Sequence, residues 1–498
     1  MTSLWKLSAL ATGLLLAGCS LAPTYERPAV PAPAAFKEAA GSTEDWKPAQ
    51  PADDRSRGDW WAVFADPALN TLEQQALAGN QDLQAAAARL RASRALRQAA
   101  NSQWFPQLSA GFGPTRQKVS PASLGLAPDA PTSASTLWRE QAAVSYEVDL
   151  FGRVASSVNA ATADSQQNEA LFQGVQLVLQ ADVAQGYFLI RELDAEQALY
   201  TSTVQLRTQT LALLQKRFDA GDTDELDLAR ARTELASAQA AALGISRSRA
   251  DAEHALAVLL GKAPADFSLA ASPLAPVTIS IPAGLPSSLL ERRPDIAAAE
   301  RAMAAANARI GVARAAFFPS LNITGALGYE SAQLGHLNDW SSRTFLFGPL
   351  AGTMLSLPVF DGGLRKATVA QARAAYEEDV ADYRQTVLNG FHEVEDGLAD
   401  LRILGSQQQA EDDAVQSARR AAQLSHLRYQ EGSISYLDVI EADRSVLEQQ
   451  QQAVQLSGER VRAAVGLIRA LGGGWNPPAA TAAAASASPA PLLAAAHE

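Results

Sequence analysis

The sequence predicts a mainly α-helical chain with a small transmembrane β part and an internal duplication. Two helix-like runs end in the same Phe-Pro pair, at 105–106 and 318–319, and Asp82 and Asp295 are separated by the same offset. Two stretches of about sixty-five residues contain no proline, which is typical of very long helices. Short runs between these features alternate apolar and polar residues with the period of a β-strand.

A second pair of similar runs supports the duplication. RFDAGDTDELDLARA at 217–231 matches RYQEGSISYLDVIEA at 428–442 at nearly the same offset. Two matches at nearly one offset indicate two copies of a unit of about two hundred residues, which is far longer than a solenoid repeat. We assign the copies to residues 69–270 and 286–472, each with the order helix, strand, strand, long helix, turn, helix. Residues 271–285, rich in Pro and Ser, form the linker between them.

The N-terminus is typical of an exported lipoprotein. The apolar run after Lys6 is shorter than the roughly 20 residues of a membrane-spanning helix, so residues 1–18 are expected to be a cleaved signal peptide. The order Leu-Ala-Gly-Cys at its end resembles the bacterial lipobox, which predicts lipidation of Cys19. Ser20 follows, and in lipoproteins this implies delivery to the outer membrane. A buried core thiol is the alternative for Cys19, and the lack of a second cysteine excludes an intramolecular disulfide.

The two ends of the mature chain differ from its middle in composition. Residues 19–68 are expected to form a lipid-anchored extended segment, because an anchored segment can lie along a partner surface. Residues 473–498, rich in Ala, Pro and Ser, are expected to be a disordered tail.

The composition argues against several classes of function. A formal net charge of −12 argues against a nucleic-acid partner, because phosphate binding needs clustered Lys and Arg. The sequence has no GxSxG or GxxxxGK motif. The histidines show no metal-ligand spacing, so we expect no enzyme, no cofactor and no metal; they are His254, His336, His392, His426 and His497.

Each copy begins with a helix that should end at a proline. Pro106 and Pro319 lack an amide donor and restrict the residue before them, here Phe105 and Phe318. Beyond each proline the period of the sequence changes from helical to two. We expect a helix-to-strand junction at both places, with Phe318 and its neighbour Phe317 at a membrane boundary.

The strands that follow alternate in a way that is typical of transmembrane strands. One face of the run 137–150 is apolar and the other polar, and the run 320–330 behaves in the same way. The run 344–360 is less regular, being apolar on both faces for part of its length. An antiparallel sheet packed on a soluble core is the alternative for any one of these strands.

Four strands cannot close a barrel, and an open sheet edge cannot lie in hydrocarbon because its unpaired amides and carbonyls would each cost several kcal/mol. Closure therefore requires several chains. Two chains would give an eight-stranded barrel, and its interior would be nearly filled by side chains. Three chains would give twelve strands and room for a channel.

The long helices are predicted at 153–218 and 364–429. Apolar or aromatic residues in the second step by three or four, which is coiled-coil spacing; they are Tyr376, Val380, Tyr383, Val387, Phe391, Val394, Leu398 and Leu401. The remaining faces are polar, as in the wall of a water-filled tube. A soluble coiled coil is the alternative that the helices alone favour.

The turn after each long helix has the same chemistry in both copies. Gly221 and Gly432 can supply the left-handed residue that ends a helix. Asp224 and Ser435 fit the N-cap of the next helix, and the residues three positions later complete a capping box. We therefore prefer a structural role for those residues, Asp227 and Asp438.

Several motifs occur in order along the mature chain: DLFGR at 149–153, RRPDI at 292–296, FPSL at 318–321, FDGGLRKA at 360–367 and ALGGGW at 470–475. Together with the turn at 428–442 they are similar to the TolC-type outer-membrane factors of bacterial tripartite efflux pumps, and most of all to their lipoprotein, drug-efflux branch. The resemblance implies a homotrimer in outer-membrane lipid, with a 12-stranded β-barrel continuous with a long periplasmic α-helical barrel. It also implies a periplasmic adaptor (membrane fusion) protein and an inner-membrane transporter of the RND type as partners.

In this family the periplasmic end is closed near the second turn, and the resemblance assigns the gate to Leu437, Glu441 and Arg444. These positions share one helix face. Their counterparts in the first copy are Leu226, Arg230 and Thr233, so the two hairpins differ chemically. Without the resemblance, Glu441 and Arg444 would be interpreted as a solvated ion pair.

The function that this resemblance implies is a passive duct that opens when the helix tips untwist, with energy supplied by the partner transporter. The alternative is a periplasmic coiled-coil adaptor or scaffold lipoprotein. An adaptor would show one helical hairpin flanked by β-rich domains, and the doubled hairpin with paired strands argues against it.

Overall fold

The computed structural model describes residues 21–30, 33, 36–38, 58–275, 292–348 and 354–473, and most of them are helical. This confirms the mainly α-helical class. Contacts divide the chain into two compact units, each assembled from distant segments. The first unit comprises residues 1–29, 89–169 and 298–384, and the second comprises 30–88, 170–297 and 385–498.

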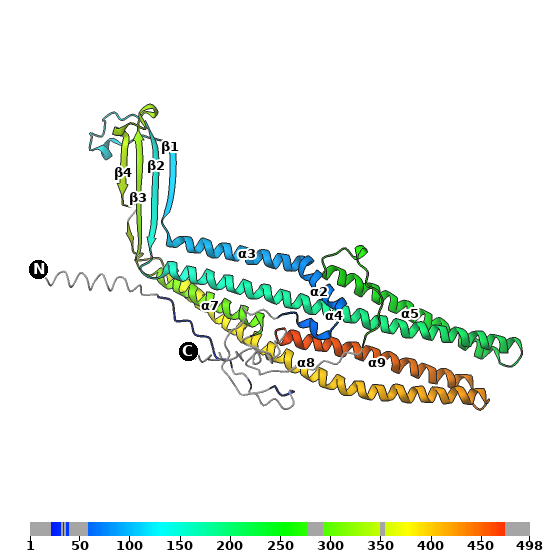
Figure 1. Cartoon of the computed structure of the whole chain (residues 1–498). Coiled ribbons are helices and arrows are strands. Elements are labelled where there is room, and N and C mark those ends of the chain that lie inside the picture. The colour runs from blue at the N-terminus through cyan, green and yellow to red at the C-terminus, as the bar shows by residue number, and fades with distance from the viewer. Residues whose placement is uncertain are drawn as a thin grey trace, which may run out of the picture. The chain divides into compact units, whose positions relative to one another are not determined.

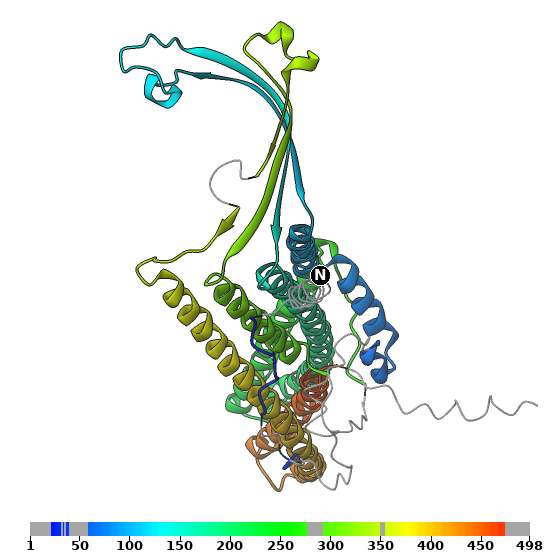
Figure 2. The same ribbon diagram turned by 90° about the vertical axis from the view of Figure 1, so that its left-hand side faces the viewer.

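The first unit contains an antiparallel sheet with the strand order β1-β2-β3-β4, shown in Figure 1. Its long strands, which bend along their length in Figure 2, are β1 (Gln107–Gln117), β2 (Ser135–Val148) and β3 (Ser320–Ser331). The run expected as one fourth strand is divided into β4 (Arg343–Phe347) and β5 (Leu355–Ser356), which both pair with β3. Residues 349–353 between them lie outside the described part.

The register of the sheet separates apolar from polar side chains. Residues that pair across antiparallel strands share a face, so Leu108, Val144, Gly325 and Phe347 lie in one row. That face carries Leu108, Ala110, Phe112, Trp138, Ala142, Val144, Tyr146, Val148, Leu321, Ile323, Leu327, Tyr329, Phe345 and Phe347. The opposite face is mostly polar, and its Arg139 and Glu330 are paired in register and joined at 2.9 Å. Large apolar side chains are thus held exposed on one side, with Phe345 84% and Leu108 81% accessible.

Each helix of this unit that leads into a strand ends four or five residues before the expected proline. Helix α3 (Gln81–Asn101) passes through a 3-10 turn to Phe105, which is extended, and β1 follows Pro106. Helix α7 (Pro294–Ala315) ends with Phe318 N–H donating to the carbonyl of Ala315, and β3 follows Pro319. At this junction the rings of Phe151 and Phe318 stack with centroids 4.9 Å apart.

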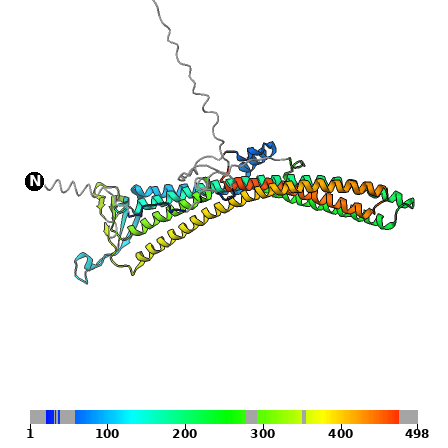
Figure 3. The ribbon, with the colours of Figure 1, turned by 90° about the horizontal axis from the view of Figure 1, so that it is seen from below.

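Two very long helices each contribute residues to both units. The bounds of these helices lie within a residue of the expected ranges. They are α4 (Arg153–Asp219) and α8 (Leu364–Gln430). Along α8 the predicted seam is buried or half-buried, with Val387 and Val394 inaccessible. The second unit adds α2 (Pro67–Gly79), α5 (Glu225–Leu259) and α9 (Tyr436–Ala470). In it α8 and α9 lie side by side, as Figures 1 and 3 show.

Short 3-10 helices complete the described elements: η1 (Trp60–Phe64), η2 (Ser102–Trp104), η3 (Pro121–Leu124), η4 (Pro264–Asp266), η5 (Leu334–His336) and η6 (Trp340–Ser342). The predicted signal peptide, Cys19, most of the predicted linker and nearly all of the predicted tail lie outside the described residues.

The core of the second unit is an aromatic and aliphatic cluster that surrounds α2. It includes Trp60, Trp61, Leu69 and Phe188. Glu73 of α2 is fully buried in this unit, and neither carboxyl oxygen has a hydrogen-bond partner in the described part. Burial, with a smaller contribution from Asp59, raises the pKa of Glu73 to about 9. The carboxyl group is therefore protonated at neutral pH.

Across the helices that the structure describes, no segment combines the length and the apolarity needed to cross a membrane.

The buried Glu73 predicts that the stability of the fold depends on pH. Its pKa rises from 4.5 in the unfolded chain to about 9 in the folded chain, so folding takes up a proton between these pH values. The contribution of this group to stability is fully present below pH 4.5 and falls by about 1.4 kcal/mol per pH unit as the pH rises towards 9. Glu73→Gln, which cannot ionise, is expected to flatten this dependence in chemical unfolding at pH 6 and pH 8.5. The control is Glu225→Gln at an exposed position; equal slopes in all three proteins would exclude the protonated Glu73.

Candidate functional site

The candidate site lies at the two helix tips of the second unit, where α4 turns into α5 and α8 turns into α9. Both turns contain a glycine with positive φ, 81° at Gly221 and 73° at Gly432. The backbone hydrogen bonds are equivalent: Gly221 N–H donates to Phe218 and Gly432 N–H to Tyr429, at 2.9 and 3.0 Å. Equivalent local sequences thus produce equivalent turns.

The helix caps after the turns are similar but not identical. Asp224 accepts a hydrogen bond from the Asp227 amide at 2.9 Å. In the second copy the Asp438 carboxylate accepts from the Ser435 amide and hydroxyl, at 2.9 and 2.7 Å. These bonds, the hydroxyl first, lower the pKa of Asp438. Asp227 instead forms an ion pair with Arg230 at 3.3 Å.

An apolar cluster joins the tips of the two hairpins. Its buried members are Leu214 of α4, Leu228 and Ala231 of α5, and Tyr436, Val439 and Ile440 of α9. The ring of Tyr429 lies 5.7 Å from that of Tyr436, and the Arg217 guanidinium lies 5.6 Å from the Tyr429 ring. Burial, and to a lesser extent Asp443, raises the pKa of Tyr436 to about 12. Its hydroxyl is therefore neutral at physiological pH.

Glu234 of α5 is the polar centre of this region. Its side chain is only 8% exposed and binds two arginines from different helices. Arg207 of α4 forms an ion pair with Glu234 Oε2 at 3.0 Å and donates a hydrogen bond to the Glu234 backbone carbonyl at 2.7 Å. Arg444 of α9 donates through Nε to Glu234 Oε1 at 2.9 Å. A single buried carboxylate therefore connects the first hairpin to the second.

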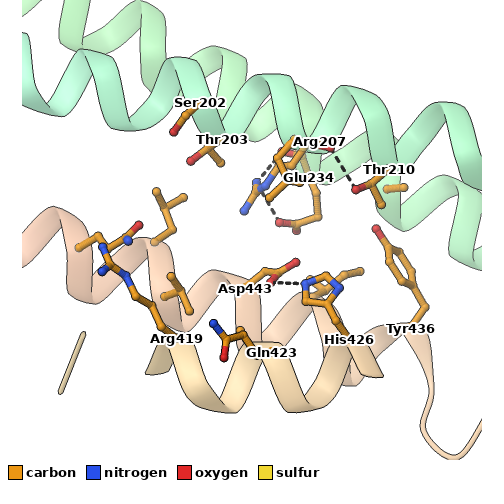
Figure 4. Close-up of a pocket in the computed structure, with 17 residues that line it drawn as sticks. Ser202, Thr203, Arg207, Thr210, Glu234, Arg419, Gln423, His426, Tyr436 and Asp443 are labelled. Atoms are coloured by element: carbon orange, nitrogen blue, oxygen red, sulfur yellow. Dashed lines mark hydrogen bonds and ion pairs between the residues drawn. The ribbon is translucent and has the colours of Figure 1, made fainter. Parts of the chain in front are cut away.

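These groups surround a cavity of about 380 Å³ between the four helices, shown in Figure 4. Arg207, Glu234, His426, Tyr436 and Asp443 are among its lining residues. His426 and Asp443 form a hydrogen bond of 2.9 Å that links α8 to α9. The polar groups that line the cavity are thus largely paired with one another.

The three residues assigned to the gate have different surroundings. Leu437 and Glu441 are exposed, and the Arg444 side chain is 58% exposed despite its bond to Glu234. That hydrogen bond raises the pKa of the Arg444 guanidinium. Within the described part no hydrogen bond or ion pair joins Glu441 to Arg444, so the solvated pair considered from spacing alone is not formed.

The counterparts in the first copy have no equivalent role. Leu226 is exposed, Arg230 is paired with Asp227, and the Thr233 hydroxyl donates to Ala229 of its own helix. Arg207 and Glu234 are not among the residues that the sequence predicts for the site. The difference between the two copies at this position could have indicated Glu234, because the second copy has Ser445 there.

The other predicted positions lie elsewhere. Phe105, Pro106, Phe318 and Pro319 form the helix-to-strand junctions of the first unit, and Cys19 is outside the described residues. No group of three or more His, Cys, Asp or Glu side chains within the described ranges could hold a metal ion.

Comparison with known proteins gives consistent matches. The family described as outer membrane efflux protein matches residues 72–262 and 285–473. A probable efflux pump outer membrane protein of Pseudomonas putida, TtgC, is 35% identical over 94% of this chain and 95% of its own. The solved outer-membrane channel OprN is 31% identical with a TM-score of 0.82, covering 92% of this chain and all of its own. The open state of the MtrE outer membrane channel of Neisseria gonorrhoeae is 31% identical with a TM-score of 0.79, covering 92% and 98%.

The bond network at the tips predicts that Glu234→Gln loosens the contact between the hairpins. Two arginines would lose their carboxylate, and a charge-assisted hydrogen bond contributes about 1.5–3 kcal/mol. The amides of residues 226–234 and 436–444 are therefore expected to exchange with deuterium at least about tenfold faster. Glu441→Gln is the matched control, since Glu441 is exposed and forms no bond to Arg444. Equal exchange in the two variants would show that Glu234 does not join the hairpins.

Proposed function

The chain belongs to the outer membrane efflux protein family, and we propose that three copies of it form a passive duct gated at the helix tips. It is the outer-membrane channel component of an efflux system and extends into the periplasm. The number of copies, the barrel, the gate, the lipid anchor and the partners are parts of this proposal.

The sheet of the first unit is the observation that carries the proposal. Its exposed apolar face suits lipid, and its polar face suits water. In the described part β1 and β4 each have a strand on one side only. Hydrocarbon cannot satisfy the free amides and carbonyls of these edges. Pairing β1 of one copy with the fourth-strand edge of the next would remove both edges.

Three is the copy number that best fits a channel. Three copies supply twelve strands. Two copies supply eight, and the interior of an eight-stranded barrel is nearly filled by side chains. The helices also offer a surface for a neighbouring copy. Along α4, exposed apolar residues recur at multiples of seven residues, the repeat of a coiled coil; they are Leu171, Val178, Leu206 and Leu213.

The gate would consist of Leu437, Glu441 and Arg444 repeated around the threefold axis. In each chain Arg444 is also tied to Glu234, so we propose that opening requires this bond to break as the second hairpin moves away from the first. The existence of an open state in the similar MtrE channel supports a duct that changes conformation.

The remaining parts follow from the family. We propose that Cys19 carries lipid, that a periplasmic adaptor and an RND-type inner-membrane transporter dock to the channel, and that the cargo is small toxic compounds. The name of the similar TtgC, an efflux pump outer membrane protein, supports this assignment. We propose no catalytic role. The alternative, a coiled-coil adaptor, gains no support from the family match.

Neighbouring residues of β4 test the orientation of the sheet. Phe345 lies on the apolar face and Thr344 on the polar face. An arginine on a lipid-facing strand costs about 2–4 kcal/mol at the bilayer midplane, so Phe345→Arg is expected to reduce the heat-modifiable trimer band in gels of outer membranes. Thr344→Arg should leave that band intact. If both variants behave alike, the face assigned to lipid is wrong.

Single-channel recording in planar bilayers tests the gate. Glu441→Ala combined with Arg444→Ala should raise conductance, because the ring of charges and the bond to Glu234 are both removed. Glu234→Gln alone is expected to raise the open fraction, because it frees Arg444 and leaves the ring in place. A mostly closed current in all these variants would count against this gate.

A further inference from the structure

The second unit contains another cavity, which lies apart from the proposed gate. Its volume is about 550 Å³, within the range of about 300–1,000 Å³ that is typical of sites for small ligands. Both copies of the repeated unit contribute to its lining, through the starts of α3 and α7, the ends of α5 and α9, and residues of α4 and α8. All of its lining residues belong to the second unit.

One part of the cavity wall is apolar. Helix α4 contributes Leu177 and Leu179, which are buried, and the end of α5 contributes Leu259. Gly174 leaves further space, because a Cβ at this position would meet only Pro294 Cβ in the described part, at 3.8 Å. This wall can therefore cover the apolar body of a small ligand.

The charged part of the lining has an excess of acids. Four acidic and two basic residues line the cavity: Asp82, Asp182, Asp295, Glu393, Arg293 and Arg469. Two negative charges therefore remain in excess. Negative charge in a concave site with an apolar wall attracts a cation.

In the second copy the acids are neutralised by the chain itself. The Arg293 side chain is only 8% exposed, and it donates to Asp295 at 3.1 and 2.7 Å and to Glu393 at 2.7 Å. It also donates to the carbonyl of Ala470 at 2.9 Å. One guanidinium therefore connects two carboxylates with the end of α9.

The first copy has the corresponding acids without this guanidinium. Asp182 occupies the position in α4 that Glu393 occupies in α8, and Asp82 likewise corresponds to the acid of α7. Asn80 takes the place of the arginine. Its side-chain amide donates to the carbonyl of Leu259 at 2.9 Å, which repeats the arginine's bond to the end of α9. Because an asparagine is neutral, it leaves the charge of the two acids uncompensated.

Neither of these two carboxylates has a hydrogen bond or an ion pair in the described part. Asp82 is exposed and lies in the first turn of α3, where the helix dipole favours a negative charge. Asp182 is half-buried and has no such support. Burial raises the pKa of Asp182, and Arg469 opposes this shift without forming an ion pair. The carboxylate that most lacks a partner is therefore Asp182.

We propose that the cavity binds a small amphiphilic cation. The ammonium or guanidinium group of the ligand pairs with Asp182, at the place that corresponds to Arg293 in the second copy, and its apolar body lies along Leu177, Leu179 and Leu259. Binding here requires neither the gate nor a partner protein. The inference therefore goes beyond the proposed function, and either can fail without the other.

Two photoreactive probes of matched shape test the charge of the ligand. They are para-aminomethyl benzophenone, which is an ammonium ion at neutral pH, and its neutral para-hydroxymethyl counterpart. The assembled full-length protein is irradiated, because Leu171 and Val178 of the cavity wall also belong to the stripe proposed to meet a neighbouring copy. Mass spectrometry should find cross-links at Leu177, Leu179 and Leu259. The ammonium probe should give about tenfold more of them, because it makes a charge-assisted bond.

Two variants test the carboxylate. Asp182→Asn should lower labelling by the ammonium probe about tenfold and leave labelling by the neutral probe in place. Asn80→Arg keeps every carboxylate but supplies the missing guanidinium from the chain, so it should also abolish the preference for the ammonium probe. Asp251→Asn, which removes the same charge from an exposed position on α5, is the matched control and should keep the native ratio. An unchanged ratio in Asp182→Asn and Asn80→Arg, or a native chain without cross-links at the cavity, would overturn the site.

Discussion

The backbone groups at the two edges of the sheet, in β1 and β4, are the constraint on which the rest of the architecture depends. The register of β1 to β4 collects large apolar side chains on one face, where they are exposed, and polar ones on the other. We propose that this face lies in lipid, where hydrocarbon could not satisfy the amides and carbonyls of β1 and β4, each of which has a strand on one side only in the described part. The proposed trimer follows from this conflict, since closure by further copies gives every strand a partner on both sides.

The two similar halves of the chain have the same local turn geometry but differ in their charged residues. The two turns share a glycine with positive φ and equivalent hydrogen bonds. Their caps already differ, because Asp438 binds Ser435 whereas Asp227 binds Arg230. The divergence matters most at Glu234, which one copy supplies to bind an arginine of the other. Similar hairpins can therefore have different roles: the first supplies the carboxylate, and the second supplies the arginine that binds to it.

The junctions at Pro106 and Pro319 concentrate several requirements at one level. Helices α3 and α7 end four or five residues before the prolines, and the aromatic residues beside the prolines are exposed. Leu21 of the N-terminal segment contacts Arg314 near the end of α7. The bidentate bond between Arg27 and Glu300 holds the N-terminal segment along α7.

The sequence alone determined what depends on neighbours along the chain. The bounds of α4 and α8, the helix ends shortly before prolines and the glycine turns follow from local sterics and periodicity. The tertiary structure decided what depends on distant partners: Arg444 meets Glu234 across 210 positions and Arg27 meets Glu300 across 273. It also placed two segments of the predicted fourth strand, β4 and β5, in different registers against β3. Periodicity reports which face of an element is apolar, and only packing selects the charged group that each arginine finds.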